Sequence, residues 1–100
     1  MTEQRPIITA ARVPTAKGSR YLQQLCKHWG HKLDVTFDPG HGEVKFPNAL
    51  CVMDAEPDVL VVRVKVEDPA ESARMQDVVA RHLDRFAFRE APLSFNWQPA

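Results

Sequence analysis

The stretch LVVRVKVEDPAESARMQDVVARHLDRF, residues 60–86, contains the two hydrophobic periods that decide the fold. Every second residue over 60–66 is apolar, which predicts a β-strand with one buried face. Asp68 then supplies an N-cap and Pro69 suits the first position of a helix, so we expect a helix to begin there. Its apolar residues recur every three or four positions up to Phe86, where we expect it to end. These residues are Met75, Val79, His82, Leu83 and Phe86.

An amphipathic helix is also predicted upstream, because apolar residues there share one face at 3.6 residues per turn. Thr15 or Ser19 can cap its start, and Gly30 suits a left-handed stop at its end. The apolar residues are Leu22, Leu25, Cys26 and Trp29.

Most of the remaining chain has the period of two that predicts strands, at 7–13, 34–37, 43–46, 50–54 and 93–97. Asp38-Pro39-Gly40 is expected to form the turn of a hairpin, and Pro47-Asn48 to break or bulge the chain. The order β-α-β-β-β-β-α-β predicts an α+β fold with two layers. The polar face of the strands indicates a mostly antiparallel sheet of about five to six strands, with both helices on its other face.

The composition is that of an ordinary globular protein, with 44% hydrophobic and 26% charged residues among 100. We expect a single domain over 1–100 with a loose N-terminus at 1–6. Thirteen basic residues balance thirteen acidic ones, so neither nucleic acid nor a membrane is expected as a partner. There is no membrane-spanning apolar run, no signal-peptide pattern and no CxxC spacing between the cysteines. These features predict a cytoplasmic protein, and they leave both a monomer and a homodimer open.

The segment CKHWGHK, residues 26–32, brings a thiol and two imidazoles together, as a metal site would. On a helix, however, Cys26 and His28 lie about 200° apart, so they cannot share one ion. If Gly30 ends the helix, His31 lies beyond it. The cationic residues of the segment are instead expected at the helix C-terminus, where the helix dipole favours them. They are Lys27, His28, His31 and Lys32.

His82 is the histidine of most interest, because it lies within the apolar stripe of the second helix. It is expected to be a core residue with one hydrogen-bonded ring nitrogen, or to line a pocket. Tyr21 and His28 lie at the edge of the apolar face of the first helix. The possible ligand-facing residues are therefore Tyr21, His28 and His82, whereas His41 lies in a tight turn and is expected to be solvated.

No catalytic motif accompanies these residues. The serines lack the G-x-S-x-G elbow, the GHG at 40–42 has no strand–helix context, and no zinc-protease, P-loop or dinucleotide-binding pattern is present. Cys51 lies in a predicted strand with no neighbouring histidine in the sequence, which leaves open a partner from elsewhere in the fold. We therefore predict no catalytic, cofactor-binding or metal-binding residues and no cofactor, and we favour a protein that is not an enzyme.

The segments SRYLQQLCKHWGHK (19–32) and QDVVARHLDRFAFRE (76–90) resemble the hallmark stretches of the bacterial domain-of-unknown-function 2218 family. TAARVPT (9–15) and EVKFPNALCVMDAE (43–56) are also similar to it, so the resemblance covers nearly the whole chain. It implies no catalytic role for any residue. It implies a link to iron-siderophore handling, since similar domains accompany siderophore-interacting, flavin-dependent ferric reductase domains. The matching positions are Tyr21, Cys26, His28, His31, Lys32, His82, Phe86 and Phe88.

Three functions are consistent with these patterns. The first is a non-catalytic binding or accessory module, whose partner would be a redox or siderophore-handling protein. The second is a small-ligand-binding or enzymatic domain with a pocket near His28 and His82. The third is a structural domain that associates with itself through a sheet edge or the uncovered sheet face.

Overall fold

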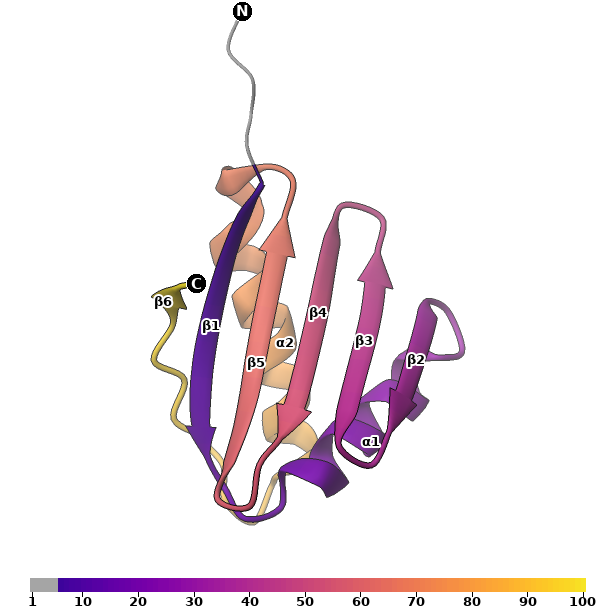
Figure 1. The fold of residues 1–100 in the computed structure, drawn as a ribbon, viewed down its shortest axis with the longest axis vertical. Coiled ribbons are helices and arrows are strands. Elements are labelled where there is room, and N and C mark those ends of the chain that lie inside the picture. The colour runs from indigo at the N-terminus through magenta and orange to yellow at the C-terminus, as the bar shows by residue number, and fades with distance from the viewer. Residues whose placement is uncertain (1–5) are drawn as a thin grey trace, which may run out of the picture.

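The strands form one antiparallel sheet in the computed structural model, which describes residues 6–100 (Figure 1). Six strands lie in the order β2-β3-β4-β5-β1-β6, and every neighbouring pair is antiparallel. The expected α+β fold is therefore confirmed. The strands are β1 (Ile7–Pro14), β2 (Asp34–Asp38), β3 (His41–Phe46), β4 (Ala49–Ala55), β5 (Val59–Val66) and β6 (Gln98–Pro99), and the helices are α1 (Gly18–Trp29) and α2 (Ser72–Phe86).

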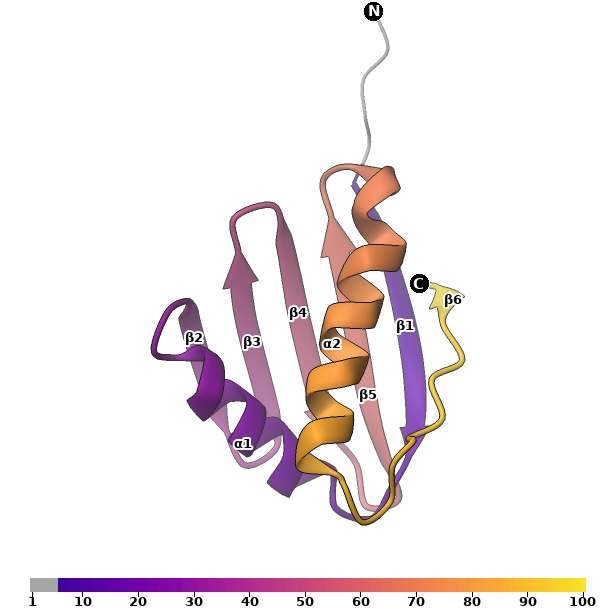
Figure 2. The same cartoon turned by 180° about the vertical axis from the view of Figure 1, so that it is seen from behind.

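Both helices cover the same face of the sheet, as the alternating strands predict (Figure 2). Helix α1 lies mainly over β2, β3 and β4 and also contacts β5, whereas α2 lies over β5. The apolar stripes of the helices lie in this interface, where Leu22, Leu25, Val79 and Leu83 are completely buried. No helix of the described residues covers the opposite face of the sheet (Figure 1). No helix within residues 6–100 has the length and apolar character needed to cross a membrane.

The ends of α1 differ from the prediction at three residues. Neither Thr15 nor Ser19 is the N-cap, because the helix begins between them, at Gly18. The Thr15 hydroxyl accepts a hydrogen bond from the Lys17 amide at 3.1 Å, and Ser19 is paired with Gln23 inside the helix. Gly30 ends the helix as expected, but with right-handed angles of φ −61° and ψ −15°. No left-handed residue is needed there, since the chain leaves the helix through a right-handed turn closed on the carbonyl of residue 29.

The start of the second helical segment agrees with the sequence. The Asp68 carboxylate accepts a hydrogen bond from the Ala70 amide at 3.0 Å. Pro69 opens a single 3₁₀ turn, Pro69–Glu71, that leads into α2. Helix α2 ends at Phe86, as the apolar stripe predicts.

The predicted last strand at 93–97 is wrong. Residues 93–97 form no sheet pairing, and the sheet gains only Gln98–Pro99, which pairs with Thr9 and Ala10. The Leu93 amide instead donates to the Asp84 carboxylate on α2 at 2.8 Å. The alternation in this segment reflects packing alone, because Leu93, Phe95 and Trp97 rest against the core from an extended chain.

The β2–β3 hairpin brings α1 unusually close to the sheet. The Asp38 carboxylate accepts from the amides of Gly40 and His41 and closes the turn without a positive φ at Gly40. Gly42 then lies directly beneath α1, where an added Cβ would stand 2.8 Å from the Cys26 sulfur. Real Cβ atoms do not make such short contacts, so only glycine fits this position without a shift.

Candidate functional site

The fold brings His28 and His82 together and separates them from Tyr21. The centroids of the two imidazole rings lie 5.8 Å apart, where the last turn of α1 meets α2. His28 is exposed and also meets the edge of Phe86 at 5.8 Å. Tyr21 is buried, and its hydroxyl donates to Glu90, in the segment after α2.

His82 is half-buried and held in one orientation. Its Nδ1 lies 2.7 Å from the Val78 carbonyl oxygen, one helical turn earlier. A carbonyl oxygen only accepts, so Nδ1 carries the donated proton and Nε2 is the acceptor in the neutral ring. The ring also packs against Trp29 at a centroid distance of 4.9 Å. His82 therefore joins a hydrogen bond within α2 to an aromatic contact with α1.

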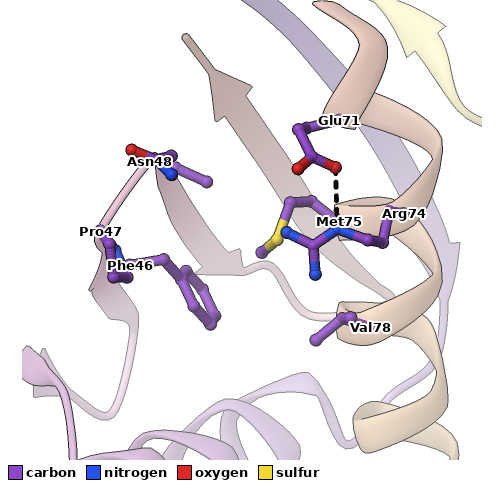
Figure 3. A pocket seen from close by; sticks show the side chains of 8 residues that line it. Phe46, Pro47, Asn48, Glu71, Arg74, Met75 and Val78 are labelled. Carbon is purple, nitrogen blue, oxygen red and sulfur yellow. Dashed lines mark hydrogen bonds and ion pairs between the residues drawn. The ribbon is translucent and has the colours of Figure 1, made fainter. Parts of the chain in front are cut away.

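A notch on the helical side of the molecule lies next to the histidines and is connected to them by aromatic contacts. Trp29 meets the Phe46 ring edge-on at 5.0 Å, and Phe46 lines the notch. The turn between β3 and β4 forms one wall, and the first two turns of α2 with the residue before them form the other (Figure 3). The notch has a volume of about 270 Å³. Its lining residues are Phe46, Pro47, Asn48, Ala49, Glu71, Arg74, Met75 and Val78.

The notch combines an apolar interior with a polar rim. Phe46, Met75 and Val78 direct apolar side chains between the two walls (Figure 3). At the rim, Arg74 Nε donates to Glu71 at 2.8 Å. No hydrogen bond involves the terminal nitrogens of Arg74 within residues 6–100. The guanidinium therefore keeps its outer, fork-shaped end available for an acceptor.

Sequence reasoning missed this notch. Pro47-Asn48 is read from the sequence as a break in a strand, and Met75 as a core residue. Met75 is indeed buried, with 5% of its surface exposed. The position of the β3–β4 turn beside α2 follows from sheet order and helix placement, which are non-local. One feature of the sequence points to the rim of the notch. Glu71 and Arg74 are spaced by three residues in a predicted helix, so they can pair beside its apolar stripe.

Tyr21 belongs to a different polar cluster, beneath the start of α1. Thr15 donates to the two carboxylate oxygens of Glu90 at 3.0 and 3.2 Å, and Tyr21 donates to the same carboxylate. Burial raises the pKa of Tyr21 above 10.0, and the Glu90 carboxylate raises it further. The Tyr21 ring is part of the core, while its hydroxyl reaches this polar cluster.

His41 is not the solvated turn residue that the sequence suggests. It begins β3, on the sheet face away from the helices, where its Nδ1 lies 2.5 Å from Asp54 and its Nε2 lies 2.8 Å from Glu43. Arg63 also donates a hydrogen bond to Asp54, at 2.9 Å. These four side chains form a row of charged and polar groups across the strands. Hydrogen bonds to Asp54 and then Glu43 raise the pKa of His41 above 6.5. Cross-strand register produces this row, because Asp54 and His41 are direct partners in neighbouring strands.

Both cysteines are buried free thiols. Burial raises the pKa of Cys26 to about 11. Burial and the nearby Cys26 raise the pKa of Cys51 to about 12. Neither thiol is therefore ionised near neutral pH, where a cysteine nucleophile must be a thiolate. Among residues 6–100, no three or more His, Cys, Asp or Glu side chains are grouped to hold a metal ion.

Comparison with known proteins finds a matching family and a similar solved structure. The profile of a family described as "Uncharacterized protein conserved in bacteria (DUF2218)" matches residues 10–98. The NMR structure of PA4090 from Pseudomonas aeruginosa is similar, with a TM-score of 0.79 and 38% sequence identity. That match covers 94% of this chain and 97% of PA4090. No protein of curated function matches the chain.

Proposed function

This chain belongs to the DUF2218 family of uncharacterised bacterial proteins, and from that premise we propose that it is a non-catalytic binding module that takes a small molecule into its notch. The observation that carries the proposal is the notch itself, with its apolar walls and the outward end of Arg74 at its rim. Apolar pockets with a few convergent polar groups are the usual form of small-molecule sites.

The lining selects the chemistry of the ligand. Phe46, Met75 and Val78 favour a flat, apolar body, because burial of apolar surface drives such binding. The terminal nitrogens of Arg74 match the two oxygens of a carboxylate, which a guanidinium binds in a bidentate manner. A volume of about 270 Å³ suits a molecule with one ring. The ligand class that we propose is therefore an aromatic carboxylate.

Binding without catalysis is supported by the side chains near the notch. The carboxylate of Glu71 is hydrogen-bonded to Arg74, whose charge is permanent. Cys26 and Cys51 are buried in the core rather than in the notch lining. The residues of the notch thus provide shape and one pair of opposite charges, in which the terminal nitrogens of Arg74 remain free to donate, and neither thiol is placed there as a nucleophile.

We further propose that the module acts in the cytoplasm beside a redox or siderophore-handling protein. Support for this step comes from the family resemblance and from the two unpaired thiols, which suit a reducing compartment. The free acid 2,3-dihydroxybenzoate is an aromatic carboxylate of the proposed class, whereas the same aryl group within a catecholate siderophore is an amide, so the free acid is the probe for this link. Failure of a purified siderophore-interacting flavin reductase to bind the protein would count against this partner, while leaving the notch untouched.

The ligand class is tested by titrating the ¹⁵N-labelled chain with 2,3-dihydroxybenzoate and, separately, with benzoate. We expect saturable amide shifts concentrated at 46–49 and 71–78. Arg74→Gln should weaken binding about tenfold, as loss of one charged hydrogen-bonding partner does. Arg81→Gln is the matched control, because Arg81 lies on the same helix, outside the notch lining, and is paired with Asp77.

Either aryl carboxylate binding at 46–49 and 71–78 supports the notch as the site. Tighter binding of 2,3-dihydroxybenzoate than of benzoate supports the siderophore link, whereas equal binding removes it. Shifts that do not saturate, or that are the same in Arg74→Gln, would overturn the proposed function.

A further inference from the structure

A second hollow lies at the start of α1, against the end of α2 and the segment that follows it. It has a volume of about 240 Å³, and its lining is more polar than that of the notch. It shares no residue with the notch. Its lining residues are Lys17, Arg20, Tyr21, Gln24, Phe86, Phe88 and Arg89.

The three cations of this hollow have no ionic partner in the part of the chain from residue 6 onward. The ion pairs of that part involve other residues, and Lys17, Arg20 and Arg89 occur in none of them. Glu90 lies next to Arg89 in the chain, but its carboxylate is engaged by the hydroxyls of Tyr21 and Thr15. The structure therefore gathers three cations, and the neighbouring Glu90 carboxylate is held by two hydroxyls and forms no ion pair with them.

The surroundings of the cations add two features that favour an anion. No side chain caps the N-terminus of α1, and its first turn holds no acidic residue. The partial positive charge of that helix end is therefore added to the three cations. Phe88 is 70% exposed, and the Arg89 guanidinium lies over its ring at 5.7 Å. The face of this exposed ring attracts the guanidinium and so helps to hold Arg89 beside the hollow, where it can meet an anion.

We propose that this hollow binds a small anion with several negative charges, of the phosphate or carboxylate type. Several negative charges are required, because an ion pair with one exposed cation contributes little binding free energy in salt-containing water. A small anion that reaches three cations at once gains from all of them. This site is independent of the proposed function, since Arg74 and the apolar notch play no part in it.

The test is an NMR titration of the ¹⁵N-labelled chain with inorganic pyrophosphate and, separately, with citrate, in a buffer free of other polyvalent anions. We expect saturable shifts at the amides of Lys17, Arg20, Phe88 and Arg89. Arg20→Gln and Arg89→Gln should each weaken binding about threefold to fivefold, and the double variant should abolish it. Added KCl should weaken binding through screening.

Arg81→Gln serves as a control that removes a cation elsewhere, and it should bind as the unaltered chain does. Binding of pyrophosphate alone identifies a phosphate site, and binding of citrate alone identifies a carboxylate site. Shifts spread over all surface cations, no saturation, or unchanged binding in the double variant would overturn the proposal. A well-dispersed spectrum of each variant shows that it is folded, so lost binding is then due to the lost charge.

Discussion

Tyr21 reports directly on the polar cluster beneath α1, because the chain contains one tyrosine. Burial and the Glu90 carboxylate disfavour its phenolate, so we expect the phenolate absorbance of the folded protein to appear at a pKa above 10.0. The contribution of this group to stability is present in full below pH 10.0 and is lost as the pH rises through the folded pKa. Glu90→Gln should bring the midpoint closer to that of the urea-unfolded chain. If the titration midpoint of Tyr21 in the unaltered folded chain equals that of the urea-unfolded chain, the hydrogen bond to Glu90 is contradicted.

His41 provides a second single-residue test, on the open face of the sheet. Its pKa is raised by Asp54 and Glu43, so its stabilising effect is present below pH 6.5 and is lost as the pH rises through the folded pKa. The side chain is 40% exposed, so we expect about 1 kcal/mol or less. His41→Gln should therefore lower the free energy of urea unfolding more at about pH 5.5 than at about pH 8.5.

The imidazole titration of His41, followed by NMR, separates this effect from other charges. Its midpoint should fall when Asp54 is replaced by Asn. Equal losses of stability at both pH values, together with an unchanged midpoint in Asp54→Asn, would show that the row of charges does not act on His41.

At the scale of elements, the contact between α1 and β3 depends on a missing side chain. A Cβ at Gly42 would lie 2.8 Å from the Cys26 sulfur, whereas one at Gly40 would have only an Asp38 oxygen at 3.7 Å. Gly42→Ala should therefore lower the free energy of unfolding by about 1–3 kcal/mol, as overpacked cores do. Gly40→Ala is the matched control and should change it by about 0.5 kcal/mol or less.

A double variant distinguishes the steric contact from a general loss of glycine. Cys26→Ala removes the opposing sulfur, so it should cost less in the Gly42→Ala background than in the natural chain. Strictly additive losses of unfolding free energy would mean that the sulfur is not what Gly42 makes room for.

Substitutions at a buried position in α2 and at an exposed position after α1 should differ in their effect on stability. Leu83 is completely buried beneath α2, so Leu83→Ala should cost about 2–5 kcal/mol in chemical unfolding. His31 is exposed beyond the end of α1, and His31→Ala should change stability by about 0.5 kcal/mol or less. A large loss at His31 would indicate that it makes contacts that its position after α1 does not provide.

The sequence predicts elements well where a long hydrophobic period coincides with a capping residue. Helix α2 has both, with Asp68 as N-cap and an apolar stripe that ends at Phe86. The alternation over 93–97 is misleading, because it records which side chains touch the core and does not require a hydrogen-bonded neighbour. Turn residues are also ambiguous, since Gly30 and Gly40 both allow a positive φ that neither adopts.

At the scale of the whole molecule, the two layers follow from the sequence but the notch does not. Alternation in the strands and stripes on the helices imply one covered sheet face. The notch arises because the β3–β4 turn lies beside the start of α2, although the two are separated along the chain by β4 and β5 (Figure 3). The approach of His28 to His82 is of the same kind, because it depends on how α1 and α2 are placed over the sheet. Sequence patterns describe single elements, and such sites depend on pairs of elements.

The proposal that the notch binds an aromatic carboxylate is tested by a search for intermolecular nuclear Overhauser effects between 2,3-dihydroxybenzoate and the labelled protein. We predict contacts between the ring protons of the ligand and the methyl groups of Met75 and Val78, with further contacts to the ring of Phe46. These residues line the apolar walls of the notch. If the ligand instead contacts His28 or Phe88, or shows no contact at saturating concentration, the notch is not the binding site.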